Sequence, residues 1–341
     1  MTCLHIRRSL VVACLLAGTL AGTLAGTLAG AAETAGALPA LDTQARWTVA
    51  APAQTQLPAR IVRVLRPQDV LAYAAPGVLF PARNIGLQCQ GVNATLADLP
   101  QRSALAQTAT GNTELRFGEA EIAGTPVFRL QAGAHDALAP GSASRCELVS
   151  YPMAESALPS GQTFWWALSF WADDWSGSHD EQLIAQFHVQ EPRKLLLNPF
   201  FALVVRGSAL RVELRHNPLD LPTQASTQLV TAARLAMPVR QWVTAVVQAR
   251  MGKDAAQAPF LRMWLNGALV ADYTGPLGYV LPPGGLAYAK AGIYHWLAGN
   301  DWDLAVPSRA LLIGAMLGVR DATGRYTAEQ MAAAVAPAER R

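Results

Sequence analysis

The 341-residue chain has few charged residues and almost no lysine. Charged side chains make up 15% of the sequence, 27 Lys and Arg stand against 24 Asp and Glu, and only 3 of the basic residues are lysines. A chain with so little basic excess lacks the positive charge that is typical of a nucleic-acid-binding protein. At 51% hydrophobic residues, it is also too apolar to be a disordered chain.

Several motifs of catalysis and cofactor binding are absent as well. The chain has no G-x-S-x-G elbow, no H-E-x-x-H, no Gly-rich phosphate loop and no C-x-x-C. These absences remove support for an α/β serine hydrolase, a zincin, a P-loop NTPase and a zinc ribbon. A structural Ca²⁺ ion stays open, since the sequence does not predict one.

The first residues have the pattern of a secretion signal. Arg7 and Arg8 precede the apolar run 9–20, and Ala29-Gly30-Ala31 is an A-x-A site for a signal peptidase. We predict a signal peptide over residues 1–31 and a secreted or periplasmic protein, with an uncleaved membrane anchor as the alternative. Cleavage would leave 25 basic against 24 acidic residues, so the mature protein is nearly neutral and needs no contact with the membrane.

Cysteine is scarce, and its placement agrees with export. Of four cysteines, Cys3 and Cys14 lie in the predicted signal, which leaves Cys89 and Cys146. An even pair in an oxidising compartment predicts one disulfide that closes a loop of roughly 60 residues. Two buried free thiols are the alternative.

The remainder of the chain has the pattern of β-strands. Residues 32–74 indicate a low-complexity linker and N-terminal extension, and residues 75–335 a single domain. Short runs of apolar, β-branched and aromatic residues there are separated by Gly, Pro, Asn and Asp, which predicts an antiparallel sandwich or jelly roll. Only residues 327–335 have a helical pattern, with Thr327 as N-cap. The predicted strands include 127–131, 164–171, 183–189, 200–206, 210–215, 242–250, 260–265, 291–296 and 310–319.

Three of the strand-like segments place unlike polar groups on one face, because residues two apart on a strand share a face. Taken singly, each has a structural explanation, such as a surface ion pair or a hydrogen-bonded core histidine. Together they supply a guanidinium, an amide, an imidazole, an ammonium and phenols. The segments are Arg145-Cys146-Glu147-Leu148, Gln186-Phe187-His188, and Tyr288 to Tyr294, in which Tyr288, Lys290, Gly292 and Tyr294 share a face.

One reaction that needs this set is β-elimination from a uronic-acid polymer. The C5 proton beside a carboxylate becomes removable only when the carboxylate charge is neutralised, which an arginine or an amide donor can do. A base must then take that proton, and an acid must protonate the departing O4 oxygen. Histidine and tyrosine suit these two roles, and no cofactor is required.

In this order the three segments resemble the signatures of alginate lyases of polysaccharide lyase family 7 and of related jelly-roll lyases, which include heparin lyase I and glucuronan lyase. Residues 264–267 (Trp-Leu-Asn-Gly) are more similar to the heparin lyase I-like group. The resemblance covers roughly residues 145–296. It implies a concanavalin A-like β-jelly-roll sandwich of two antiparallel sheets, with a concave groove for an acidic polysaccharide.

The resemblance also implies roles for individual residues. Arg145 and Gln186 would neutralise the substrate carboxylate. His188 would be the base or a carboxylate partner, and Tyr294 the acid, or both acid and base. Lys290 would bind a neighbouring sugar, and Glu147 would orient Arg145. We add three residues to the predicted substrate-binding set, namely Tyr288 on the strand of Lys290, and Arg211 and Arg215, whose strand face could line an anionic groove.

This sequence departs from the family pattern at three places. Phe187 stands where alginate lyases usually have Ile or Val, a position linked to the preferred uronate. Ala289 replaces an aromatic residue, and His295-Trp296 replaces a polar pair. Because the mature protein is nearly neutral, we favour an unsulfated polyuronate such as glucuronan or alginate, without excluding heparin-like chains. We expect a monomeric enzyme; the alternative is a non-catalytic β-sandwich that binds acidic polysaccharides.

Overall fold

A computed structural model describes most of the chain beyond residue 84. The described residues are 85–89, 92–95, 104–107, 113–133, 144–150, 157–173, 175, 181–296 and 308–337. All of them belong to one compact unit, residues 38–341. The predicted signal peptide (1–31) and linker (32–74) lie outside the described residues.

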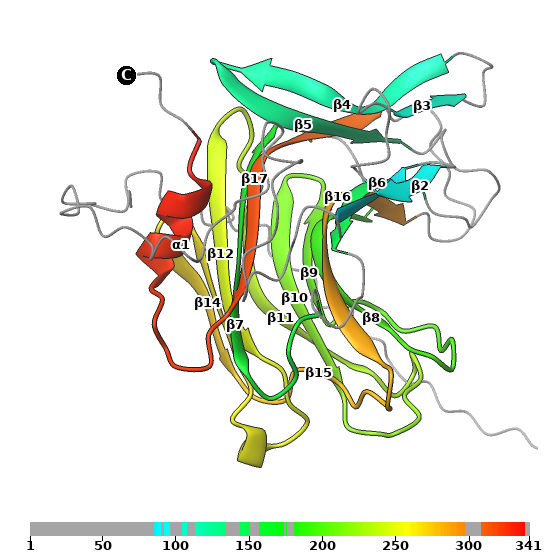
Figure 1. The fold of residues 1–341 in the computed structure, drawn as a ribbon, viewed down its shortest axis with the longest axis vertical. Coiled ribbons are helices and arrows are strands. Elements are labelled where there is room, and N and C mark those ends of the chain that lie inside the picture. Colours follow the sequence, from blue (N-terminus) through cyan, green and yellow to red (C-terminus); the bar gives the residue numbers. More distant parts are fainter. Residues whose placement is uncertain are drawn as a thin grey trace, which may run out of the picture. The chain divides into compact units, whose positions relative to one another are not determined.

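The described strands form two sheets (Figure 1). The first sheet has nine strands, eight in one path and β15 (Gly278–Tyr279) beside β10. All neighbours in the path are antiparallel, and only the short β15 runs parallel to its neighbour. The path is β11 (Gln228–Ala236), β10 (Ala209–Asn217), β9 (Phe201–Arg206), β8 (Glu181–Gln190), β16 (Leu286–Trp296), β6 (Ser144–Ser150), β1 (Ile85–Cys89) and β2 (Val92–Thr95).

The second sheet has eight strands, and all of its described neighbours are antiparallel. Every strand predicted from the sequence falls within an observed strand, except that the predicted strand 200–206 begins one residue before β9. The order is β14 (Ala268–Thr274), β13 (Phe260–Leu265), β12 (Trp242–Arg250), β7 (Thr163–Ala172), β17 (Arg309–Arg320), β5 (Thr125–Ala132), β4 (Thr113–Ile122) and β3 (Ala104–Gln107).

The core lies between the sheets and is built from alternate residues of each strand. Phe187 of the first sheet, for example, packs against Phe164 and Trp166 of the second, with ring centroids 5.6 and 5.5 Å apart. Since successive side chains on a strand point to opposite faces, the residues on either side of Phe187 face away from the core. The predicted all-β jelly-roll sandwich of two antiparallel sheets is confirmed.

A single α-helix occurs in the described part of the chain, α1 (Ala328–Val335). Thr327 caps it, as the sequence predicts, and forms a capping box with Gln330. Met331 and Val335 of the helix join Trp165 and Val246 in a second, smaller apolar cluster on the outer face of the second sheet. Among the described residues no helix has the length and apolarity to cross a membrane.

Candidate active site

The three polar segments of the sequence lie on three neighbouring strands of the first sheet, β6, β16 and β8. Cross-strand register makes partners of Arg145 and Tyr294, and also of Glu147 and Gly292. On the other side of β16, Lys290 pairs with Gln186 and Tyr288 with His188. Residues paired in register share a face, so all of these groups face away from the core. We call this surface of the first sheet the site face.

A β-bulge shapes the middle of the site face. The register between β16 and β8 shifts by one residue between Ala291 and Tyr294, and a second shift between β8 and β9 falls between Leu183 and Ala185. Gly292, within the bulge, has a φ of +149°. A Cβ there would lie 2.3 Å from the Cys146 carbonyl oxygen, so only glycine lets β16 approach β6 this closely.

Four side chains form a buried polar network on the site face. The Lys290 ammonium donates to Glu147 Oε2 at 3.3 Å and to Gln88 Oε1 at 2.9 Å. The Gln186 amide donates to the other oxygen of Glu147. Glu147 and Lys290 are 1% and 4% exposed, so this ion pair is removed from water. Burial lowers the pKa of Lys290, and the charge of Glu147 opposes that shift.

This network differs from the expected roles of two residues. The resemblance implies that Glu147 orients Arg145, whereas its oxygens bind Lys290 and Gln186. The resemblance implies that Lys290 binds a neighbouring sugar, yet its side chain is 5% exposed and is held inside the protein by Glu147 and Gln88. Its buried position favours an indirect role instead.

Arg145 pairs in register with Tyr294 and has no carboxylate partner among the described residues. Its guanidinium carbon lies 4.7 Å from the centre of the Tyr294 ring. Burial is the largest cause of the pKa shifts of His188, Tyr288, Lys290 and Tyr294, and the charge of Arg145 contributes to lowering all four pKa values. Arg145 is therefore a cation whose charge acts on all four of these groups.

His188 is held as a neutral imidazole. Burial, followed by the charge of Lys290, lowers its pKa from 6.5 to about 4. Its Nδ1 lies 2.9 Å from the Val189 carbonyl oxygen and 2.8 Å from the Val189 amide nitrogen. In the tautomer protonated on Nε2, Nδ1 accepts the hydrogen bond of the Val189 N–H; in the tautomer protonated on Nδ1, the ring donates to the Val189 carbonyl and leaves a lone pair on Nε2, the form that a base requires.

Two tyrosines flank the site, and both stay protonated. Burial raises the pKa of Tyr288 to about 12, with a further contribution from Glu147. Burial also raises the pKa of Tyr294, where Arg145 acts in the opposite direction. The Tyr288 ring lies 5.7 Å from the His188 ring, whereas Tyr294 lies beside Arg145. The site face thus carries a neutral imidazole and two phenols.

Arg211 and Arg215 lie on the site face as well, on β10. Gln186 and Glu213 both pair with Ala202 of β9, which places Glu213 in the same row, about 10 Å away at the usual strand spacing. Glu213 binds Arg211 at 3.1 Å and Arg215 at 2.7 Å, and Glu181 also pairs with Arg211. The structure therefore brings these two arginines near the site but neutralises much of their charge internally.

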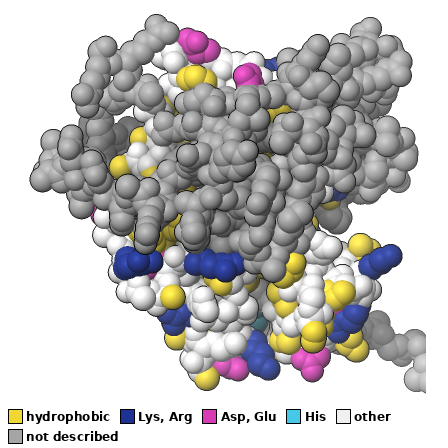
Figure 2. Space-filling view, viewed as in Figure 1, with side chains coloured by type: hydrophobic (Ala, Val, Ile, Leu, Met, Phe, Trp, Pro, Cys, Tyr) yellow, Lys and Arg dark blue, Asp and Glu magenta, His cyan; other side chains and the backbone are white. Residues whose placement is uncertain are grey.

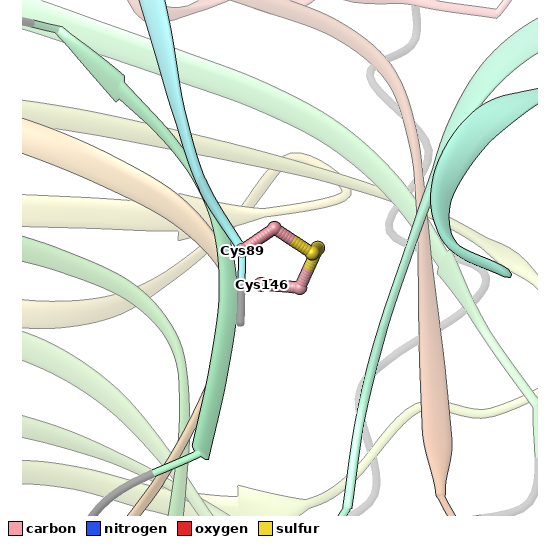
Figure 3. The surroundings of a disulfide bond; sticks show 2 residues. All are labelled: Cys89 and Cys146. Atoms are coloured by element: carbon pink, nitrogen blue, oxygen red, sulfur yellow. A yellow bond between two sulfur atoms is a disulfide. The ribbon is translucent and has the colours of Figure 1, made fainter. Parts of the chain in front are cut away.

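Gln88 is the site residue that the sequence did not single out. It lies on β1, pairs in register with Glu147, and precedes Cys89, which forms a disulfide with Cys146 (Figure 3). The predicted disulfide could have identified Gln88. Antiparallel pairing of Cys89 with Cys146 sets residue 88 opposite residue 147.

Two departures from the family pattern meet in the core below the site. Phe187 and Ala289 are cross-strand partners, and both are fully buried. Phe187, which is larger than the Ile or Val of the family pattern, thus lies beside Ala289, which is smaller than the aromatic residue of that pattern. The two changes together conserve the volume of the core. Since Phe187 points away from the site face, any effect it has on the substrate is transmitted through the position of its neighbours Gln186 and His188.

The sandwich and the ionisable groups on its site face are features of jelly-roll polysaccharide lyases. The sequence profile of the polysaccharide lyase family matches residues 110–308, more than half of the chain. The chain belongs to this family and is a polysaccharide lyase, as the sequence predicts. No curated protein sequence matches it.

Solved structures with a similar arrangement of strands are also lyases. An endo-β-1,4-glucuronan lyase from the fungus Trichoderma reesei has 13% identity and a TM-score of 0.48, over 65% of this chain and 92% of that one. The family 7 alginate lyase A1-II′ has 17% identity and a TM-score of 0.46, over 73% and 99%. An alginate lyase from Pseudomonas aeruginosa has 15% identity and a TM-score of 0.44, over 70% and 99%.

Proposed function

We propose that this lyase is exported and cleaves an unsulfated polyuronate by β-elimination, leaving an unsaturated uronate at the new end. The observation that carries the proposal is the guanidinium of Arg145, which has no carboxylate partner among the described residues, lies over the protonated phenol of Tyr294 and helps to lower the pKa of the neutral His188 imidazole. These groups meet the three needs of the reaction, namely neutralisation of a carboxylate, removal of a proton and protonation of a leaving group.

Arg145 is the group proposed to bind the carboxylate of the reacting sugar. A planar guanidinium can donate two parallel hydrogen bonds to a carboxylate, and Arg145 has no described carboxylate partner to displace. Neutralising the carboxylate stabilises the negative charge that develops when the C5 proton leaves. Gln186 lies on β8, two strands from Arg145, where its amide donates to Glu147, and it is proposed as a second donor to the carboxylate.

His188 is the proposed base, and Tyr294 the proposed acid. A pKa of about 4 keeps His188 neutral near pH 7, so its Nε2 lone pair can accept the C5 proton. The raised pKa of Tyr294 keeps the phenol protonated until it gives its proton to the O4 leaving group. Tyr288, across from His188, is proposed to contact the sugar that lies over the imidazole.

The distribution of charge supports an unsulfated substrate. A sulfated chain presents several anionic groups per disaccharide and calls for many free cations. Here Arg211 and Arg215 are already paired with Glu213, and Lys290 is paired with Glu147. On the face drawn in Figure 2, the described Lys and Arg side chains lie apart from one another. Arg145 is left as the principal free cation of the described site.

A substrate panel tests the proposal. The mature protein is incubated with alginate, polyglucuronate, hyaluronan and heparin while the ultraviolet absorbance of the unsaturated uronate is followed. We expect absorbance to rise with alginate or polyglucuronate and to rise least with heparin. No absorbance with any of the four would overturn the proposed reaction, and a preference for heparin would overturn the unsulfated substrate. New reducing ends without absorbance would indicate hydrolysis.

Export is proposed from the signal-like residues 1–31 together with the disulfide between Cys89 and Cys146, since structural disulfides persist in oxidising compartments. The test is the N-terminal sequence of the enzyme recovered from the periplasm or the medium. We expect it to begin at Ala32. Recovery of full-length chain in the membrane fraction would instead identify the segment as an anchor.

A further inference from the structure

The buried ammonium of Lys290 is held from two sides. Glu147 on the adjacent strand β6 provides a carboxylate oxygen at 3.3 Å, and Gln88 on β1 provides an amide oxygen at 2.9 Å. Gln88 thus reaches past Glu147 to a residue two strands away. No described residue other than these two hydrogen-bonds the Lys290 side chain, although an ammonium has three donors.

We propose that Gln88 is a positioning residue of the lyase site, and that the Cys89–Cys146 disulfide holds Gln88 in place. This inference rests on the proposed function. The amide oxygen of Gln88 fixes the ammonium of Lys290 between β1 and β6, and Lys290 in turn fixes Glu147 and, through it, Gln186. Gln88 itself touches no substrate in this arrangement.

The buried charge of Lys290 needs more than one acceptor. A buried ammonium loses its hydration and needs protein acceptors in compensation. Glu147 divides its two oxygens between Lys290 and Gln186, so it cannot satisfy Lys290 alone without releasing Gln186. Gln88 supplies the missing acceptor without adding a negative charge, which would repel the carboxylate of the substrate.

The disulfide adds a covalent link to the pairing of β1, which is a short strand. β1 is five residues long, and its neighbour on the outer side, β2, has four. The cross-link joins Cys89 to Cys146, the pair of residues directly next to the pair Gln88 and Glu147. The disulfide therefore fixes the register at the one place where β1 contributes to the site (Figure 3).

The first experiment compares Gln88→Met with Gln88→Glu. Methionine keeps the length of the side chain and removes the acceptor, so we expect kcat to fall about tenfold with KM nearly unchanged. Glutamate restores an acceptor, so kcat should recover toward the wild-type value while KM rises by repulsion of the polyuronate. Gln248→Met, on β12 of the second sheet, is the matched control and should have wild-type kinetics. Equal kcat in wild type and Gln88→Met would overturn the proposal.

A second readout does not depend on activity. Burial is the largest cause of the lowered pKa of His188, and the charges of Lys290 on β16 and Arg145 on β6 add to it, while Tyr288 on β16 pairs with this histidine in register. When Gln88→Met loosens the ammonium, the NMR titration midpoint of His188 should rise from about 4. An unchanged midpoint in a folded variant would contradict the positioning role, even if the wild-type protein cleaves none of the polymers.

The disulfide is tested in a double-mutant cycle. Cys89→Ser with Cys146→Ser should lower kcat and raise the His188 midpoint in the same direction as Gln88→Met. In the Gln88→Met background, removing the disulfide should change both quantities little further, because the residue it positions is already gone. Additive effects would show that the disulfide acts only on stability, and this part of the proposal would fail. Circular dichroism confirms that each variant is folded.

Discussion

Arg145 and Arg211 lie in one row of the site face but in opposite electrostatic settings. Register connects them through Tyr294, Leu183 and Val204, four strand spacings or about 19 Å apart. Arg211 is bound by Glu181 and Glu213, whereas Arg145 lies over an aromatic ring with no described carboxylate partner. An arginine on a strand face binds an external anion readily only where the fold does not supply an internal one.

The largest expected effect comes from removing the charge of Arg145. Arg145→Ala should lower kcat/KM on a polyuronate by about 10³-fold, because the developing charge on the substrate loses its principal donor. Arg145→Lys should recover part of this loss, since a lysine supplies the charge without the paired donors. Initial rates measured by absorbance give both values.

The matched variant on the other side of the comparison is Arg211→Ala. We expect it to lower kcat/KM by no more than about fivefold, since the pairs it breaks are partly exposed. If Arg211→Ala and Arg145→Ala lowered kcat/KM by similar factors, the pairing of Arg211 with Glu213 would not explain a difference between the two arginines.

The second prediction concerns stability and contrasts two ion pairs. Lys290→Met leaves the carboxylate of Glu147 buried and unpaired, so the free energy of unfolding should fall by about 3–5 kcal/mol. Arg211→Met should cost less than about 1 kcal/mol, because Arg215 still pairs with Glu213. Urea unfolding of both variants checks the difference. The double variant Lys290→Met/Glu147→Gln should recover part of the loss, and a loss as large as that of Lys290→Met would argue against a buried ion pair.

The strands and the helix could be predicted from the sequence because their signals are local. In Arg211–Arg215, charged and aliphatic residues alternate with period two, and these residues lie within β10 as expected. The grouping of Arg145, Gln186 and Tyr294 was reached through the family resemblance. The order β8, β16, β6 in the sheet does not follow the order of these strands in the chain.

The partners within the site could not be predicted in the same way. Arg145 and Glu147 are two residues apart, which favours pairing them, but cross-strand register brings Lys290 and Gln186 to Glu147 instead. Gln88 lies in a short apolar strand without a motif, and its role depends on non-local pairing. The bulge at Gly292 depends on the close approach of β6, which no spacing within β16 reveals.

The third prediction concerns pH. Since His188 must be neutral to act as the base, kcat/KM should rise as pH increases through about 4 and stay high to mildly alkaline pH. In Lys290→Met/Glu147→Gln this rise should move toward the ordinary value of 6.5 without reaching it, because burial, the largest cause of the shift, remains. The control Arg215→Met, on the compensated side, should leave the midpoint in place. An unchanged midpoint in the double variant would show that the charge of Lys290 does not lower the pKa of the base.

The smallest expected effect comes from removing the carboxylate that compensates the charges of Arg211 and Arg215. Glu213→Gln removes the carboxylate that binds both Arg211 and Arg215, while Arg211 keeps Glu181. The freed guanidinium of Arg215 should lower KM for the polyuronate by about two- to fivefold at low salt, and this gain should vanish at high salt. Asp272→Asn is the matched control, because it frees Arg262 on the second sheet, away from the site face, and should leave KM unchanged. A lower KM in both variants would mean that net charge, and not the position of Arg215 on the site face, attracts the polymer.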